Sequence, residues 1–447
     1  MLRSGRTGHN GSCWPGVPIT ETPLNNAESL DGQYFDVVII GAGVAGAMTG
    51  LLSSRAGLRT LLVDRQRFPR HKVCGCCVNG RAVQILKQAG LESGLKDLAA
   101  ATTSELAVRY RGRSLDVPMP VNAAVSRRVM DQWLVDEAVA CGCLFADDVT
   151  ASVEPLPCDA ILDHHAVSAS VTAESSHERI IVLRPTGTVH HATHPEVTSR
   201  QSEASSARVF ARVAVICDGL GHPSLHQLSS FGAVAEHGSR IGLGAVFPRA
   251  AVDDWIKPDQ VLMAVAQHGY AGVVEIENQQ LNLAAAVDPA HLNQTKSPLR
   301  SLEAIFHSAG VPLPAELCHA SIKGTVPLTR SARRIAGHRL FLLGDATGYV
   351  EPFTGEGMAW ALTAATAVVP LLITAVRDGW SANLGTRWQV VFREIVRREQ
   401  KICRLLSAAL RQPWLLLPIM TTCRLFPSLT RHLVSQINRV PEALESL

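Results

Sequence analysis

The chain has 447 residues, of which 47% are hydrophobic and 18% are charged. This globular composition excludes a chain that is disordered throughout, a collagen and a coiled coil. The 42 Lys and Arg nearly balance the 39 Asp and Glu, so charge gives no indication of a nucleic-acid partner. The 11 cysteines are odd in number and no secretory signal pattern precedes them, so we expect reduced thiols and a cytoplasmic protein.

Residues 1–33 are dominated by Gly, Ser, Pro, Asn and Thr, and they contain no apolar segment of the kind that a signal peptide requires. We expect a disordered leader here; a start codon assigned too early is the alternative. Residues 34–64 then predict a strand, a glycine turn, a helix and a second strand. The two strands are predicted by apolar runs rich in β-branched residues, and the helix between them is rich in small residues.

A GxGxxG motif, formed by Gly41, Gly43 and Gly46, directly follows the first of these strands. The first glycine allows a tight turn, the second lets a pyrophosphate approach the backbone, and the third lets the helix pack on the strand. Asp64 ends the second strand, where a carboxylate can accept hydrogen bonds from an adenosine ribose. In this context the motif predicts a dinucleotide-binding site rather than a plain glycine turn.

The pattern divides the remaining chain into further parts. Residues 34–235 read as the first part of the dinucleotide-binding domain, with a helix after Ser126 and a polar insertion at about 160–206. Six of the 17 histidines lie between His164 and His194, and we favour a polar loop there over a metal site. Residues 236–330 read as an antiparallel β domain, residues 331–376 as the second part of the first domain, and residues 377–447 as helices.

A second glycine-rich run, FLLGDATGYVEPFTGEGMAWAL, indicates which dinucleotide is bound. Gly344 and Asp345 end a buried strand, and Asp345 can accept hydrogen bonds from the hydroxyls of a ribityl chain. Gly355 and Gly357 let the backbone approach a flat ring, at which the next helix aims its N-terminus. Because the chain returns to the same sheet, this run predicts FAD rather than NAD; glycines that serve only turns are the alternative.

Two further segments fit FAD. Arg127 lies at a helix start, four residues before Asp131, and can reach the phosphates; an ordinary solvated Arg is the alternative. Asp218 and Gly219 end the strand VAVICDG and can approach the pyrophosphate, although a simple Asp-Gly turn fits equally well.

Four segments together resemble the FAD-dependent oxidoreductase superfamily that contains geranylgeranyl reductases, aromatic hydroxylases and flavin-dependent halogenases. They are DVVIIGAGVAGAMTG, VSRRVMDQWL, VAVICDG and GDATGYVEPFTGEGMAWAL. KVCGCCVNGRAVQIL is most similar to the geranylgeranyl reductase branch. The resemblance spans residues 36 to about 376 and implies an α/β fold: a Rossmann-like FAD-binding domain, an antiparallel β substrate domain that roofs the flavin, and a helical C-terminal region. The WxWxIP signature of halogenases is absent, and Tyr270 to Val274 lack the Trp and Phe-Pro of the YxWxFP signature of the reductases.

Cys74, Cys76 and Cys77 stand together in the segment that carries the reductase resemblance. Zinc would need a second cysteine pair with ligand spacing, which the sequence lacks, so we expect no metal. A redox-active pair and simple packing of small side chains beside the ring remain open. The resemblance implies that Cys74 lies near the flavin on the substrate side, and it is our candidate catalytic residue.

Two apolar segments bear on membranes. Residues 358–376 carry no charge over nearly the length of a spanning helix, but interspersed Ala, Thr and Pro370 favour a buried core helix. Residues 387–411 form a basic amphipathic pattern followed by WLLLPIMTT. This pattern predicts either a helix packed on the FAD domain or peripheral contact with a membrane surface.

We therefore expect an FAD-dependent oxidoreductase, similar to geranylgeranyl reductases, that reduces a hydrophobic organic substrate by hydride transfer from the flavin. An FAD-dependent monooxygenase that uses O₂ and NAD(P)H is one alternative, and a non-enzymatic flavin- or lipid-binding protein is another. No second GxGxxG opens another strand–helix unit, so NAD(P)H would dock transiently or a protein would supply the electrons.

Overall fold

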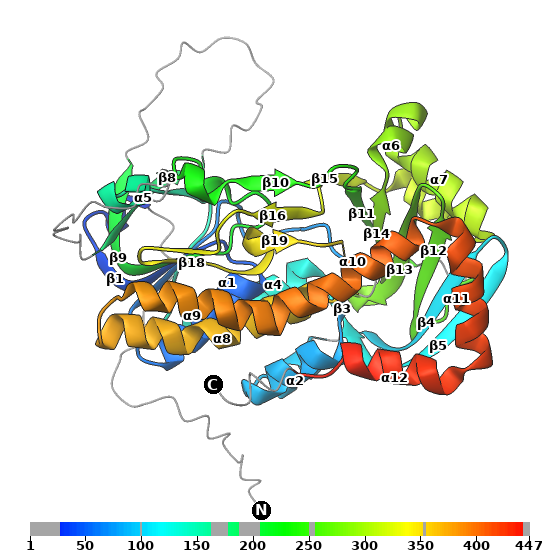
Figure 1. Ribbon diagram of the computed structural model, residues 1–447, viewed down its shortest axis with the longest axis horizontal. Coiled ribbons are helices and arrows are strands. Elements are labelled where there is room, and N and C mark those ends of the chain that lie inside the picture. The colour runs from blue at the N-terminus through cyan, green and yellow to red at the C-terminus, as the bar shows by residue number, and fades with distance from the viewer. Residues whose placement is uncertain are drawn as a thin grey trace, which may run out of the picture.

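The computed structural model describes residues 27–98, 101–161, 178–186, 206–249, 255–351 and 355–440. Most of the leader expected at 1–33 lies outside these residues, as does most of the polar insertion with all six of its histidines. Figure 1 shows two β-sheets beside each other, with the C-terminal helices running across both.

The first sheet has eight strands and contains the expected strand–helix–strand unit. Its central path is β17 (Ala336–Gly337), β18 (Leu340–Leu342), β9 (Ala207–Ile216), β1 (Tyr34–Ile40), β2 (Thr60–Val63) and β6 (Leu144–Ala146), and the pair β7 (Val149–Val153) and β8 (Arg179–Pro185) joins at β9. The strands from β18 to β6 are parallel. Strand β9 pairs with β1, and β18 pairs with β9, although both come late in the chain. The carboxyl ends of these parallel strands therefore lie at the same end of the sheet as the glycine turn that follows β1.

Beside this sheet, helix α1 (Val44–Arg55) packs against both α4 (Arg127–Ala140) and α8 (Gly357–Arg377). The start of α4 is fixed by Ser126, whose hydroxyl accepts a hydrogen bond from the Val129 amide at 3.2 Å. α8 is the helix expected at 358–376. Its length and composition would allow it to cross a membrane. However, 72% of its most apolar 18-residue stretch is buried inside the protein, where the helix packs against α1, α2 (Gly80–Gln88) and neighbouring helices.

The second sheet also has eight strands and forms the β-rich domain. Its order is β15 (Lys323–Pro327), β11 (Ile241–Pro248), β14 (Gln280–Val287), β13 (Gly269–Ile276), β12 (Gln260–Ala266), β4 (Ala101–Tyr110), β5 (Arg113–Ala124) and β3 (Cys77–Val78). The hairpin turn expected at 277–280 joins β13 to β14. Strand β11 pairs with β14 and not with the strand that follows it, so the antiparallel strands are not a simple meander.

Residues 77–124, which the sequence pattern assigns to the first domain, contribute three strands to the second sheet instead. β4 pairs in parallel with β12, and β4 and β5 form a long hairpin whose turn residues Arg111 and Gly112 both have positive φ. The boundary between the two domains therefore does not follow the chain order. Pairing with β12, far along the chain, is what places this hairpin, and local pattern carries no information about such a partner.

Side chains on alternate positions of the second sheet face two different layers. Leu262 and Ala264 of β12 pack with Leu302 and Phe306 of α7 (Pro298–Ala309), whereas Val261, Met263 and Val265 point to the opposite face. On that opposite face lie Leu416 and Met420 of α11 (Pro413–Leu425). The sheet is thus enclosed by α7 on one side and by the first domain and the C-terminal helices on the other.

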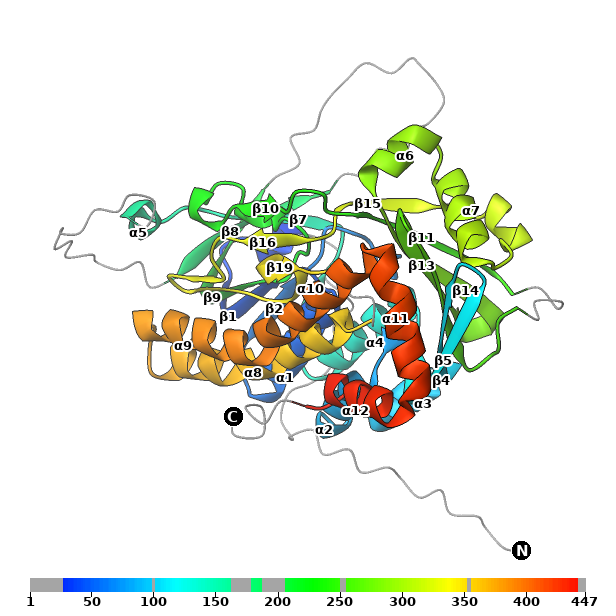
Figure 2. The same ribbon diagram turned by 45° about the vertical axis from the view of Figure 1, so that its right-hand side comes forward.

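The C-terminal region is helical, as expected. It consists of α9 (Ala382–Phe392), a π-helical turn (Arg393–Arg397), α10 (Arg398–Leu410), α11 (Pro413–Leu425) and α12 (Pro427–Ile437). Figure 2 shows α11 and α12 lying beside the β4–β5 hairpin, and both helices contact β5. The smaller elements are α3 (Glu92–Asp97), α5 (Pro157–Ile161), α6 (Pro289–Thr295), and a three-stranded sheet of β10 (Ala233–Ala235), β16 (Arg330–Ala332) and β19 (Gly348–Tyr349).

Candidate active site

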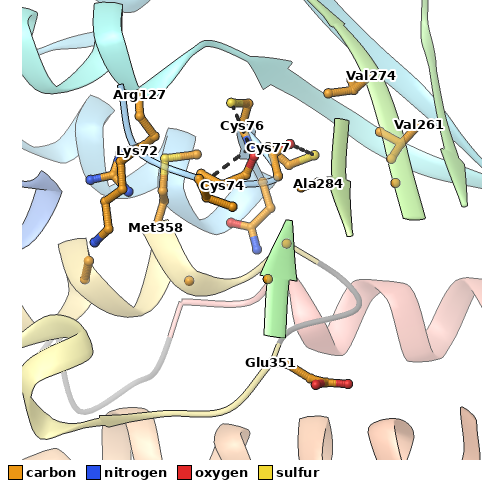
Figure 3. A pocket seen from close by; sticks show the side chains of 18 of the residues that line it. Lys72, Cys74, Cys76, Cys77, Arg127, Val261, Val274, Ala284, Glu351 and Met358 are labelled. Atoms are coloured by element: carbon orange, nitrogen blue, oxygen red, sulfur yellow. Dashed lines mark hydrogen bonds between the residues drawn. The ribbon is translucent and has the colours of Figure 1, made fainter. Parts of the chain in front are cut away.

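A cavity of about 220 Å³ lies between the glycine turn of the first sheet and the inner face of the second sheet. Both glycine-rich runs and the cysteine segment border it on one side, and strands β12, β13 and β14 border it on the other. Figure 3 shows the three cysteines between Lys72 and Arg127 on one side and Val261 and Val274 on the other. The cavity therefore has one polar side and one apolar side.

The glycine turn admits no side chain at its first and third glycines. Gly41 has φ +103°, and a Cβ there would lie 2.4 Å from the carbonyl oxygen of Cys217. A Cβ on Gly46 would lie 1.9 Å from the carbonyl oxygen of Gly41. Asp64 holds the turn from the next strand, because its Oδ2 accepts a hydrogen bond from the Ala42 amide at 2.8 Å.

Two arginines border the second glycine of this turn. A Cβ on Gly43 would lie 3.2 Å from Nη2 of Arg127 and 3.7 Å from Nη2 of Arg70. Asp131 accepts from Arg127 Nε and Nη2 at 2.8 Å each, and it also lies 3.1 Å from Arg70. Open backbone at the start of α1, flanked by two fixed guanidinium groups, is a cradle that fits the pyrophosphate of a dinucleotide.

Arg70 and Lys72 were not among the residues expected from the motifs. Both lie in the basic run RQRFPRHK directly after Asp64, and Arg70 also pairs with Asp64 at 3.3 Å. A run of cations placed directly after Asp64, the acid expected to bind the ribose, is the signal that could have identified them. Arg127, by contrast, is brought to the glycine turn as expected; although burial lowers its pKa, the charges of Asp131 and Cys74 raise that pKa above its ordinary value.

The second glycine-rich run faces the same cavity. Oδ2 of Asp345 accepts a hydrogen bond from Lys72 Nζ at 2.9 Å. Burial raises the pKa of Asp345, but Lys72 and Arg127 outweigh this effect and lower the pKa below its ordinary value. The carboxylate is therefore ionised and can accept further hydrogen bonds, as the ribityl hydroxyls of FAD require.

Positive φ angles shape the rest of this run. Gly344 has φ +57° and Gly355 has φ +74°, and a Cβ on Gly355 would lie 3.0 Å from Cβ of Cys77. Gly357 is the first residue of α8, and a Cβ there would lie 3.6 Å from the ring of Tyr349. Backbone is thus left bare at the N-terminus of α8, where a flat ring can approach it.

Asp218 is placed differently from the other acids. Its Oδ2 accepts a hydrogen bond from the Ser224 amide at 2.9 Å, and burial raises its pKa above the ordinary value. The cavity is bordered in this segment by Cys217 and Gly219. The segment therefore meets the cavity through its neighbours, while the carboxylate of Asp218 caps a local turn.

The three cysteines differ in their surroundings. Hydrogen bonding from the Cys76 side chain lowers the pKa of Cys74 to about 6, with Arg127 and Lys72 assisting against the effect of burial. The same contact and burial raise the pKa of Cys76 well above its ordinary value, and burial raises the pKa of Cys77 to about 12. Within the described parts of the chain, no group of three or more His, Cys, Asp or Glu is placed to hold a metal ion.

The apolar side of the cavity is formed by the second sheet. The lining side chains there are Val261, Met263, Val274, Ala284 and Ala286. Alternation along the strands brings these residues to one face, so the second sheet offers a hydrophobic wall opposite the polar cradle.

A buried ion pair lies at the edge of this wall and was also missed by the motifs. Arg240 Nη1 donates to Glu351 Oε1 at 3.1 Å, both side chains are 1% exposed, and Arg240 Nε also donates to Asp288 at 2.9 Å. Burial raises the pKa of Glu351 above its ordinary value. Because Glu351 borders the cavity, it is a second candidate for holding a proton beside a substrate.

Comparison with known proteins identifies relatives over most of the chain. The FAD binding domain family matches residues 34–386. A menaquinone reductase from Mycolicibacterium smegmatis is 25% identical over 392 residues and covers 85% of each chain. Digeranylgeranylglycerophospholipid reductase 1 from Methanopyrus kandleri is 23% identical over 390 residues, covering 83% of this chain and 90% of the relative. Among solved structures, p-nitrophenol 4-monooxygenase PnpA from Pseudomonas putida has a TM-score of 0.69 at 13% identity, covering 92% of this chain and 98% of the other, which shows a shared fold.

Proposed function

The chain belongs to the FAD binding domain family and is an FAD-dependent oxidoreductase, and we propose that it reduces a hydrophobic organic substrate in the cavity described above. The observation that carries this proposal is the apolar wall of β12, β13 and β14 facing the flavin cradle. Relatives named as reductases of menaquinone and of digeranylgeranylglycerophospholipid support a quinone or lipid as the class of substrate.

The residues of the cavity divide into those that would hold FAD and those that would face the substrate. The glycine turn, Arg70 and Arg127 would bind the pyrophosphate, and Asp345 would accept hydrogen bonds from the ribityl chain. Bound FAD supplies hydride transfer to an activated double bond or carbonyl. Cys74 and Glu351 border the same cavity. Glu351, whose pKa is raised by burial, can deliver the proton that the reduced product requires, and the Cys74 thiolate can accept one.

The test is an anaerobic turnover assay on yellow protein that carries about one noncovalent FAD per chain. Flavin is first reduced with NADH, NADPH or dithionite, which identifies whether a nicotinamide or another donor supplies the electrons. A quinone and a polyunsaturated lipid are then added, and mass spectrometry detects the gain of two hydrogens. Reoxidation of the flavin with a reduced product supports the proposal; reduced flavin that no such compound reoxidises contradicts it.

Oxygenation by O₂ and NAD(P)H is the second candidate, because the fold is shared with a 4-monooxygenase. Turnover with ¹⁸O₂ separates the two reactions. Incorporation of ¹⁸O into an organic product would establish a monooxygenase, whereas a product that gains only hydrogen under nitrogen establishes a reductase. A non-enzymatic flavin carrier would give neither product with any reductant.

We also propose that the C-terminal helices contact the surface of an anionic membrane. The large apolar side chains that are exposed on α10, on α11 and directly after α11 are here called the apolar C-terminal surface; they are Ile402 (50% exposed), Leu405 (73%), Trp414 (68%), Ile419 (41%), Leu425 (68%) and Phe426 (57%). Arg398, Ile402 and Leu405 recur at i, i+4 and i+7 of α10, so a cation and two apolar side chains share one helix face.

Cations are concentrated at the start of the same helix. Arg393, Arg397, Arg398 and Lys401 lie together, and the pKa of Arg397 is lowered by burial and by Arg404 and Arg393. A cluster of cations beside exposed apolar side chains suits lipid headgroups with a negative charge, since each basic residue contributes about 1 kcal/mol near such a surface.

Sedimentation with vesicles tests this contact. Wild-type protein should bind vesicles of phosphatidylglycerol and phosphatidylcholine more strongly than pure phosphatidylcholine, and 1 M salt, at which the screening length is about 3 Å, should weaken binding. The double change Leu405→Ser and Trp414→Ser should lower affinity by about tenfold or more, because both side chains lose apolar burial. Val326→Ser, a change at a 49% exposed position on β15, is the control. Absence of binding to anionic vesicles at low salt would contradict this proposal.

A further inference from the structure

Cys74 and Cys76 lie on opposite sides of one tight backbone turn. Cys76 has φ +59°, an uncommon value for a residue other than glycine, and this turn folds the two side chains toward each other's backbone. The Cys76 amide lies 3.5 Å from Cys74 Sγ, and Cys76 Sγ lies 3.7 Å from the Cys74 carbonyl oxygen. Each sulfur therefore lies against the backbone of the other cysteine.

The third cysteine is oriented differently. Cys77 Sγ donates to the Gly75 carbonyl oxygen at 3.3 Å, and its Cβ lies beside Gly355. Figure 3 shows the Cys76 and Cys77 side chains leaving the segment in different directions. Cys74 and Cys76 are therefore the pair that the backbone brings together.

We propose that Cys74 and Cys76 are a redox-active dithiol that exchanges an electron pair with FAD bound in the same cavity. In the oxidising direction, the Cys74 thiolate and the Cys76 thiol form a sulfur–sulfur bond. The two electrons and the proton of Cys76 pass to oxidised flavin, which leaves reduced anionic flavin and a disulfide; the reverse step regenerates the dithiol. This inference rests on flavin binding and is independent of whether the substrate is reduced or oxygenated.

The accessibility of the two sulfurs determines which partner they can meet. Cys74 is half-buried and Cys76 is only 2% exposed, and both residues line the cavity. A large protein oxidant cannot reach Cys76, but a flavin in the cavity can exchange electrons with Cys74. The surroundings also give the two cysteines different protonation states, which thiol–disulfide exchange requires. Cys74 is a thiolate near the cations Lys72 and Arg127, and Cys76 stays protonated because its pKa is raised.

The chain allows the disulfide to be located directly. Trypsin cleaves after Lys72 and Arg81, so Cys74, Cys76 and Cys77 fall on one peptide, residues 73–81. Flavin-loaded protein is oxidised in air or reduced with dithionite, denatured, and labelled with iodoacetamide. It is then reduced and labelled again with N-ethylmaleimide. We expect oxidised protein to carry iodoacetamide on Cys77 and N-ethylmaleimide on Cys74 and Cys76, and reduced protein to carry iodoacetamide on all three.

Anaerobic reductive titration provides a second readout that does not depend on substrate. Wild-type protein should consume about four electrons per flavin, two for FAD and two for the disulfide. Cys76→Ser should consume about half as many, and Cys77→Ser should match the wild type. The proposal is overturned if oxidised wild-type protein shows three free thiols on the peptide, or if wild type and Cys76→Ser take up equal numbers of electrons. A disulfide between Cys74 and Cys77 would likewise overturn the assignment to Cys76.

Discussion

The charge state of Cys74 is set by its neighbours. The pKa of this thiol falls from 9.0 to about 6, chiefly because the Cys76 side chain hydrogen-bonds to it. A lowered pKa means that the folded protein favours the thiolate, so this stabilisation is present above pH 9 and is lost as the pH falls through about 6. Thiolate, and not thiol, reacts with alkylating reagents.

Alkylation of dithiothreitol-treated protein should therefore follow an unusual pH profile. The rate at Cys74 should rise with a midpoint near pH 6, and Cys76→Ala should move that midpoint upward because the main stabilising contact is lost. Mass spectrometry of the tryptic peptide 73–81 measures the rate, with exposed Cys318 as the internal standard. A wild-type midpoint near 9 would show that Cys74 is an ordinary thiol.

Asp345 should be needed for flavin retention. It is an ionised acceptor at the end of a buried strand, and hydrogen bonds to a charged group contribute about 1.5–3 kcal/mol. Asp345→Ala should weaken FAD binding by roughly tenfold to more than a hundredfold. The ratio of flavin to protein absorbance after gel filtration measures the loss, with circular dichroism reporting the fold. Asp97→Ala, at an exposed position, should keep its flavin; equal retention in both variants would remove Asp345 from the site.

At the scale of residues, motif positions were predictable and their supporting partners were not. The predicted residues that line the cavity stand at strand ends or helix starts that local pattern reveals; they are Gly43, Gly344, Gly355, Gly357, Asp345 and Arg127. Arg240 and Glu351 meet only through tertiary structure, since they are separated by most of the second sheet in sequence. The exact partners of buried charges depend on such long-range contacts, which local pattern does not encode.

At the scale of elements, one buried ion pair ties α5 to the first sheet. Arg179 of β8 is fully buried and donates to both oxygens of Asp159, at 2.6 and 2.7 Å, and to the His338 carbonyl oxygen at 2.8 Å. Removing Asp159 would leave a buried cation without its carboxylate, which costs about 3–5 kcal/mol.

Asp159→Ala should accordingly lower the free energy of unfolding by about 3–5 kcal/mol. Arg208→Ala is the matched control. It breaks a pair with Glu154 in which the Arg208 side chain is 63% exposed, and such pairs contribute about 0–1 kcal/mol. Urea unfolding followed by fluorescence gives both values. Similar losses in the two variants would mean that burial does not decide the strength of the Asp159 pair.

A hydrogen bond between Asn438, at the end of helix α12, and Gly80, at the start of α2, holds α12 beside the cavity. Oδ1 of Asn438 accepts from the Gly80 amide at 3.0 Å, at the start of α2, and both Val434 and Asn438 border the cavity. Because an ordinary hydrogen bond contributes about 1 kcal/mol, this contact can hold a terminal helix without making it immobile.

Asn438→Ala should release α12 more often than in the wild type. We expect trypsin to cleave after exposed Arg431 several times faster, because about 1 kcal/mol of stabilisation is lost. Asn438→Asp keeps an oxygen acceptor and should be cleaved at nearly the wild-type rate. Timed proteolysis resolved by mass spectrometry is the measurement; identical cleavage of all three proteins would show that the contact does not hold the helix.

Elements themselves were predicted more successfully than their partners. Strands β1 and β9, helices α1, α4 and α8, and the β13–β14 hairpin follow from apolar periodicity, glycine turns and, for α4, a capping serine. The β4–β5 hairpin was not predicted, and its residues fall in the range expected for the first domain. Its pairing with β12 joins segments about 150 residues apart, which is far beyond what periodicity reports. The same limit hides the cavity wall, which exists only after β12, β13 and β14 assemble.

At the scale of the whole molecule, the most apolar helix, α8, is part of the core of the first domain. α8 begins at Gly357, directly beside the cavity, and its side chains pack on α1 and α2. Insertion of this helix into lipid would remove its N-terminus from the border of the cavity and would open the core of the first domain. The apolar C-terminal surface, in contrast, can meet a membrane without any change in the packed core.

The protein should therefore leave membranes without detergent. Charge attraction between lipid headgroups and the cations near Arg393 is screened within about 3 Å at 1 M salt, whereas a spanning helix remains inserted at any ionic strength. Washing membranes with 1 M salt should release yellow, monodisperse protein, which light scattering and flavin absorbance verify. A single-pass membrane protein extracted in parallel is the control. If detergent alone releases the chain, α8 is inserted in lipid, and the packing of α8 on α1 is not its arrangement at the membrane.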